Sequence, residues 1–170
     1  MSIYPIPAVG PQGLYDASNT RYHKLGTIAQ FETDDGLVTA MYCRNAYTTS
    51  LSAGLPVGID AGGIGYVHTA RLANASFIQN LCLGGLAASM ANSASGGYAW
   101  VILAGPQTNA FIANAITALS AAERPLGVNS SAQLITPAAS NNPVAYLGIT
   151  TATMASGTGH GNVVHWLWRG

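Results

Sequence analysis

Few side chains in this sequence are suited to catalytic or metal chemistry. The candidates are six acids, four histidines and two cysteines. They are Asp16, Glu32, Asp34, Asp35, Asp60 and Glu123, then His23, His68, His160 and His165, then Cys43 and Cys82. Paired acids can bind a cation or act as acid and base, and closely spaced histidines can share a metal. The two pairs to weigh are therefore Asp34 with Asp35, and His160 with His165.

The paired acids have a simpler structural interpretation. They precede Gly36 and lie between two strand-like runs, residues 25–31 and 37–42. Asp-Gly between such runs is a strong hairpin signal, because glycine accepts a positive φ and aspartate tolerates one. We therefore predict a β-hairpin and interpret Asp34 and Asp35 as solvated turn residues.

The remaining candidates form no recognisable site. The sequence lacks CxxC and HExxH spacing, so His160 and His165 are interpreted as structural, and no metal is expected. No Gly-x-Ser-x-Gly elbow and no nucleophile, base and orienting group converge in the pattern. Cys43 and Cys82 are interpreted as small buried apolar groups rather than a disulfide. We predict no catalytic, metal-binding or cofactor-binding residue, and no enzyme.

Charge and hydropathy exclude two classes of partner, nucleic acid and the membrane. Charged residues make up 7% of the chain and the formal net charge is +0, whereas an ordinary soluble domain has about 25% charged residues. The six basic residues form no stripe, which argues against nucleic acid. No apolar stretch approaches the roughly 18 residues of a membrane helix, and the first residues do not resemble a secretion signal, which favours folding in a cytosol. So uncharged a surface is poorly protected against association, which favours coverage by other subunits.

The elements that would position these side chains are short strands around one central run. Residues 96–105 are aromatic, aliphatic and β-branched and are closed by glycine at both ends, which predicts a buried strand. Further strands are expected at residues 57–59, 66–70, 77–83, 132–135, 144–151 and 163–168. Short strands at roughly ten-residue intervals predict an all-β fold, an antiparallel β-sandwich or barrel. Residues 86–96 fit a strand or a loop, and 110–122 a helix or a strand.

The two ends of the chain differ from the middle. Pro5, Pro7 and Pro11 keep residues 1–20 extended, so we expect an N-terminal arm, either disordered or laid over a neighbouring subunit. We expect residues 21–170 to form a single β domain. The tail carries Trp166 and Trp168, which should dock within the domain or against a neighbour.

Two blocks of the sequence resemble the head decoration or cement proteins of tailed bacteriophages. The first block holds Leu14-Tyr15-Asp16, Arg21-Tyr22-His23-Lys24-Leu25-Gly26-Thr27, Asp35-Gly36 and Tyr42-Cys43-Arg44-Asn45. The second holds Gly96-Gly97-Tyr98-Ala99-Trp100-Val101 and Gly105, ahead of Leu126-Gly127-Val128. Together they span about residues 14–45 and 80–150.

The resemblance implies a virion protein without an active site, made in the bacterial host cytoplasm. It implies a homo-oligomer, commonly a trimer, seated on the capsid surface across joints between major capsid subunits. Tyr4, Trp166 and Trp168 are then the expected subunit or capsid contacts, since buried aromatic anchors are usual hot spots. The alternative is a lectin-like β-sandwich that binds host glycan from the virion or a fibre.

Overall fold

The computed structural model describes residues 12–60, 62–69, 82–111, 125–128, 134–135, 148–150 and 162–166. As predicted, the fold is all-β, and the described residues contain no α-helix. The strands are β1 (Ile28–Thr33), β2 (Gly36–Asn45), β3 (Pro56–Ile59), β4 (Tyr66–Thr69), β5 (Cys82–Leu86), β6 (Tyr98–Ala110), β7 (Pro125–Val128), β8 (Leu134–Ile135), β9 (Gly148–Thr150) and β10 (Asn162–Trp166). In that part of the chain, no helix is long and apolar enough to cross a membrane.

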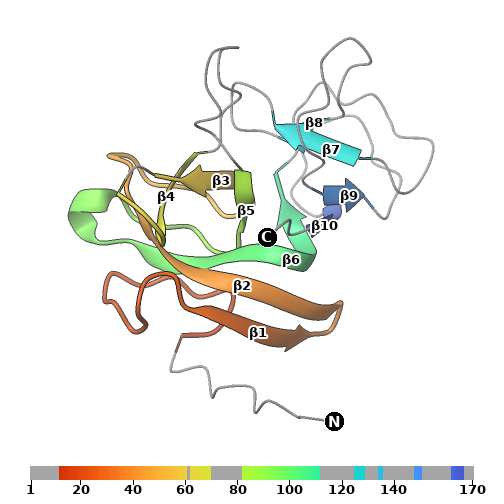
Figure 1. Cartoon of the computed structure of the whole chain (residues 1–170), viewed down its shortest axis with the longest axis horizontal. Coiled ribbons are helices and arrows are strands. Elements are labelled where there is room, and N and C mark those ends of the chain that lie inside the picture. Colours follow the sequence, from red (N-terminus) through yellow and green to blue (C-terminus); the bar gives the residue numbers. More distant parts are fainter. Residues whose placement is uncertain are drawn as a thin grey trace.

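Five strands pair into a closed ring (Figure 1). β2 pairs with β4, β4 with β3, β3 with β5, β5 with β6, and β6 returns to β2. Such closure makes a small barrel, one of the two predicted architectures. The expected antiparallel order fails at β2 and β4, which run parallel. The chain between them forms β3, which is antiparallel to β4, so β4 resumes the direction of β2.

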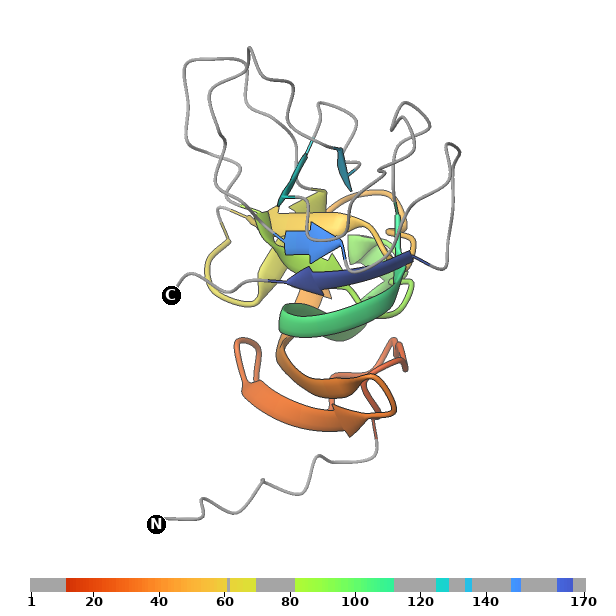
Figure 2. The same cartoon turned by 90° about the vertical axis from the view of Figure 1, so that its right-hand side faces the viewer.

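The predicted central strand is β6, and it runs beyond the predicted end to Ala110. Its first half pairs with β2, and Val101 and Ile102 also pair with β5. Its second half pairs with β10, and Figures 1 and 2 show β10 alongside it. The change of partner falls near Gly105, whose φ of +101° favours glycine. One strand thus joins the barrel to the C-terminal strand.

Both faces of β6 are buried. Successive side chains of a strand point to opposite sides. The side chains on the two sides of β6 belong to two different hydrophobic clusters, an inner one and an outer one. The inner cluster lies inside the ring and takes Val101 and Leu103, with residues from all five ring strands. The outer cluster takes Trp100 and Ile102, and Leu14, Val38 and other residues cover it from outside. A strand buried on both sides explains why the sequence of this run is almost continuously apolar.

The predicted hairpin is confirmed. β1 and β2 pair antiparallel from Ile28 opposite Met41 to Thr33 opposite Gly36, with Asp34 and Asp35 in the turn. β1 begins later than the predicted residue 25, because residues 24–27 form a turn closed by the Thr27 N–H donating to the Lys24 carbonyl oxygen.

The structure also bears on the predicted N-terminal arm and on the two stretches whose secondary structure the sequence leaves open. Of the predicted arm, Gln12 and Leu14 are buried, and Ser18 bridges to Tyr98; residues 1–11 lie outside the described residues. The ambiguous stretch 86–96 leaves β5 and becomes a loop with a short 3-10 helix, Ser93–Ser95. Most of residues 110–122 also lies outside the described part.

Candidate contact surface

The predicted contact residue Trp166 lies in the interior of its own chain. Its side chain is 3% exposed, and its indole N–H donates to Gln107 Oε1 at 2.6 Å. The predicted subunit contact therefore needs correction for this residue: the barrel covers the indole and leaves almost no surface for a neighbour. Tyr4 and Trp168 lie outside the described residues.

Gln107 is the centre of a buried amide network that the sequence reasoning missed. Its side-chain amide N–H groups donate to the Leu86 carbonyl oxygen at 2.9 Å and to Asn109 Oδ1 at 2.8 Å. Asn109 in turn donates to the Ala87 carbonyl oxygen at 3.1 Å. A buried amide is tolerated only when it is hydrogen-bonded. The network fixes Trp166 of β10 against the barrel, and the only sequence signal was a glutamine in the strand-forming run after Gly105.

A second buried network fastens residues 12–22 to the barrel. The Tyr42 hydroxyl donates to Gln12 Oε1 at 2.8 Å and accepts the Tyr22 N–H at 3.2 Å. Gln12 Nε2 donates to the Asp16 carbonyl oxygen at 2.9 Å. Burial is the main cause that raises the pKa of Tyr42 above its ordinary value of 10.0, so the phenol stays a donor. The phenol thus ties the chain before β1 to β2.

Removing the Tyr42 hydroxyl should destabilise the fold. Tyr42→Phe leaves the buried Gln12 oxygen without its donor and the Tyr22 N–H without its acceptor, so we expect a loss of about 1–3 kcal/mol. Tyr22→Phe makes the same chemical change at a side chain that is 50% exposed and should cost less than about 0.5 kcal/mol. Urea unfolding followed by tryptophan fluorescence measures both; equal losses would contradict the prediction.

The candidate chemical groups do not converge in the described residues. Asp34 and Asp35 are exposed at the hairpin turn, and no group of three metal-ligating side chains is found there. His23 packs against Tyr42 and Trp100, with ring centroids 4.9 and 5.2 Å apart. The side chains of the other histidines lie outside the description. Nothing described forms a nucleophile with its base.

Cys43 is a free thiol buried in the inner cluster, in the environment predicted for it. Burial raises its pKa well above the ordinary 9.0. The folded thiol therefore keeps its proton while the unfolded thiol ionises above pH 9. By linkage, its contribution to stability is complete below pH 9 and declines as the pH rises toward the folded pKa.

This burial predicts slow thiol chemistry. In a Cys82→Ser variant, Cys43 is the remaining thiol, and we expect a disulfide reagent at pH 8 to modify it only as fast as the protein opens. Adding urea should accelerate the reaction in step with unfolding. Reaction in native buffer at the rate of a free cysteine would contradict the burial. The Cys82→Ser/Cys43→Ala variant supplies the background rate.

The described surface carries several large exposed hydrophobic side chains. They are Tyr15, Tyr22, Ile28, Leu37, Ile59 and Ile64. Ile64 is 73% exposed and lies against Gly26, at the end of the molecule where β1 begins. Ile28 and Leu37 lie on the face of the hairpin that continues the inner-cluster side of β2, opposite the face that packs on the outer cluster. Exposed apolar side chains such as these can take part in contacts with another protein.

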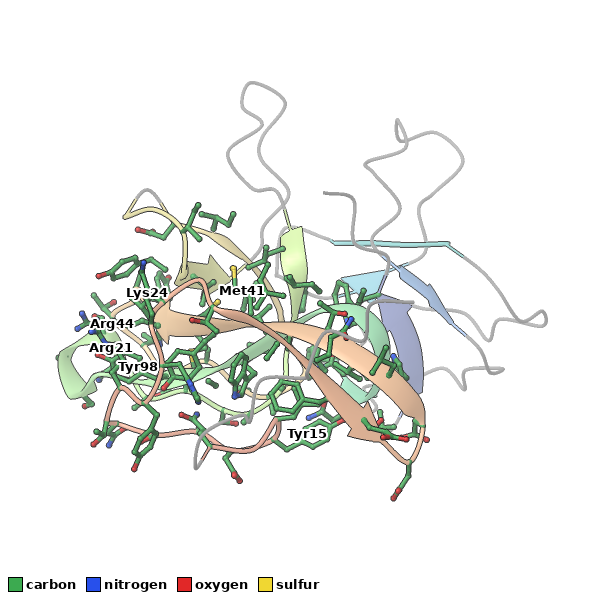
Figure 3. The ribbon with its side chains drawn as sticks, turned by 60° about the horizontal axis from the view of Figure 1, so that its bottom comes forward. Tyr15, Arg21, Lys24, Met41, Arg44 and Tyr98 are labelled. Carbon is green, nitrogen blue, oxygen red and sulfur yellow. The ribbon has the colours of Figure 1, made fainter. Side chains whose placement is uncertain are left out.

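The charges near the hairpin are separated by sign. Arg21 and Lys24 are exposed before β1, at the end that Figure 3 shows beside Tyr98. Glu32, Asp34 and Asp35 are exposed at the other end, around the turn. Arg44 is not counted with these exposed charges, because it has a structural role. Its guanidinium donates to the Ser93 carbonyl oxygen at 3.1 Å and lies 5.9 Å from the centre of the Tyr98 ring. The hairpin therefore has a basic end and an acidic end.

In comparisons with protein-family models, curated proteins and solved structures, nothing matches this chain.

Proposed function

We propose that the chain is a non-enzymatic structural protein of a bacteriophage virion, which decorates the capsid and stabilises it by bridging major capsid subunits. The observation that carries the proposal is the exposure of Ile59, Ile64 and other aliphatic side chains on a chain with 7% charged residues. Such a surface is completed by neighbours. The resemblance of the two sequence blocks to decoration proteins indicates that these neighbours are other copies of the chain and the major capsid protein.

The proposed mechanism is that of a clamp. A protein that binds only the assembled shell stabilises the shell by mass action. Several copies of a weak contact, held in one oligomer, attach firmly because later contacts form at high effective concentration. The two buried networks suit this role, since the Gln12–Tyr42 and Gln107–Trp166 bonds join the outer segments to one barrel. A clamp of this kind needs rigidity and no reactive group.

The test is binding to shells assembled from the major capsid protein of the same genome. We expect the chain to co-sediment with assembled shells and not with unassembled capsid protein. Ile64→Ser should lower shell occupancy several-fold, because the exposed apolar group is lost without disturbing the core. Asn19→Ser, an exposed polar exchange, should leave occupancy unchanged. Absence of the chain from shells at all concentrations would overturn the proposal.

A lectin-like module is the second candidate, and one observation favours it. Tyr15 is 46% exposed; burial of the rest of the side chain, and then the charge of Asp35, raise the pKa of its phenol, while a hydrogen bond with Thr108 lowers it. An exposed aromatic ring beside a carboxylate is a common feature of sugar-binding sites. Binding on a glycan array that is lost in Tyr15→Ala would support this candidate in place of the clamp.

A further inference from the structure

β1 is an open edge strand in the described part of the sheet. Its six residues pair with β2 on one side, and no other described strand pairs with it. The phase of the ladder is set by the Tyr42 N–H, which donates to the Thr27 carbonyl oxygen. Since antiparallel bonds recur at every second residue, the backbone groups of Ile28, Gln30 and Glu32 point away from β2. They form a row ready to pair with another strand.

β1 lacks most of the usual protections of an edge, and a single charged side chain, Glu32, lies on it. Natural edges are blunted by proline, lysine, bulges or inward-pointing charges. The sequence of β1 is Ile-Ala-Gln-Phe-Glu-Thr, and its register with β2 is continuous. Its one charge, Glu32, is exposed on the face that also carries Ile28. Ile28 and Leu37 are 46% and 54% exposed on that same face, so a strand added there would also cover apolar surface.

We propose that β1 pairs antiparallel with β1 of a second copy of this chain, around a two-fold axis that passes near Gln30. In this register Gln30 faces itself, and Ile28 faces Glu32 of the second copy. No like charges then meet across the new strand pair. The two hairpins become four adjacent strands of one continuous sheet, which β2 of each copy extends into its own barrel.

The separated charges favour a second copy, in this orientation, as the occupant. Antiparallel pairing brings the acidic turn of each copy, with Asp34 and Asp35, beside the basic residues Arg21 and Lys24 before β1 of the other. In this register Asp34 of one copy comes opposite Gly26 of the other, two residues from Lys24. The attraction occurs twice around the axis, whereas parallel pairing would place acid beside acid. All four side chains are exposed, so they can reach those of another copy.

The contact implies an even number of copies, whereas the resemblance to decoration proteins commonly implies three. It is independent of the capsid proposal, because it concerns the free protein. Six residues of edge make a small interface, so the dimer should be weak and concentration-dependent. Its affinity should fall as salt is added, because the charges are exposed.

The test is sedimentation equilibrium of the full chain over a dilution series, at low and high salt. Gln30→Lys places two like charges on the axis and should weaken the dimer by about tenfold or more. Thr39→Lys is the matched control, because Thr39 lies directly opposite Gln30 on β2, one strand in from the edge, and should change the affinity little. Circular dichroism checks that both variants are folded.

Charge reversal gives an independent measurement. Lys24→Glu should weaken the dimer, and adding Asp35→Lys to it should restore the affinity, because the pair is reversed as a whole. A chain that stays monomeric at every concentration would overturn the proposal, as would a dimer that Gln30→Lys and Thr39→Lys affect equally. A monomer that binds shells would support the capsid proposal and overturn the dimer. A dimer that does not bind shells would support the dimer and overturn the capsid proposal.

Discussion

Replacing Trp100 by alanine is expected to cost about 3–5 kcal/mol of the free energy of unfolding. Trp100 is fully buried in the outer cluster. Its ring lies 5.0 Å from Phe31 and 5.1 Å from Tyr42, measured between centroids, and its indole N–H points to the Gln12 carbonyl oxygen at 3.4 Å. The substitution leaves a large cavity between β6, β1 and the segment before β1.

Urea unfolding followed by circular dichroism measures this loss. Tyr15→Ala is the control, because it removes an aromatic ring that is 46% exposed and should cost less than about 1 kcal/mol. A loss for Trp100→Ala no larger than that of the control would mean that the outer cluster is not the support of β1 and residues 12–22.

Adding one methyl group at Gly85 should be nearly as damaging. A Cβ at this position of β5 would overlap Gln107 Oε1 and lie 2.7 Å from Trp166 Cζ2 and Nε1. Gly85 is held from both sides, opposite Pro56 of β3 and Ile102 of β6, so the backbone cannot move aside. We expect Gly85→Ala to cost about 3 kcal/mol or more, through overpacking and loss of the Gln107–Trp166 bond.

Thermal and urea unfolding measure the cost, and tryptophan fluorescence reports displacement of Trp166. Gly62→Ala is the matched control, because its added Cβ would lie 3.3 Å from the nearest atom, in the Tyr66 ring, at an exposed loop position. It should change stability by less than about 1 kcal/mol. Wild-type stability in Gly85→Ala would show that the Trp166 side chain of β10 does not pack against Gly85 of β5.

The local features of the fold were accessible from the sequence because their causes are local. Asp35-Gly36 sets the turn through its tolerance of positive φ, and alternating side chains set the faces of the hairpin. The run from Tyr98 to Ala104 is apolar at almost every position, which is the pattern of a strand buried on both sides. The all-β class and most described strands follow from such patterns.

The candidate site was less accessible. The sequence does not show which aromatic residues are inside: Trp166 was expected at a contact and is instead held by Gln107, 59 residues away. Gln12 and Tyr42 are 30 residues apart, and nothing in either local sequence indicates their bond. Contacts between residues so far apart depend on which strands become neighbours, and short patterns do not encode that choice.

For this protein, then, composition and local pattern determined the strands, the hairpin turn, the scarcity of reactive groups and the nearly uncharged surface. The tertiary structure alone decided that β6 returns to β2 and closes the barrel, that β2 and β4 run parallel, and that β1 is left at an edge with opposite charges at its two ends. The physical reason is that turn and strand preferences act between neighbours in the chain. Ring closure and burial depend on how distant side chains fill one shared interior.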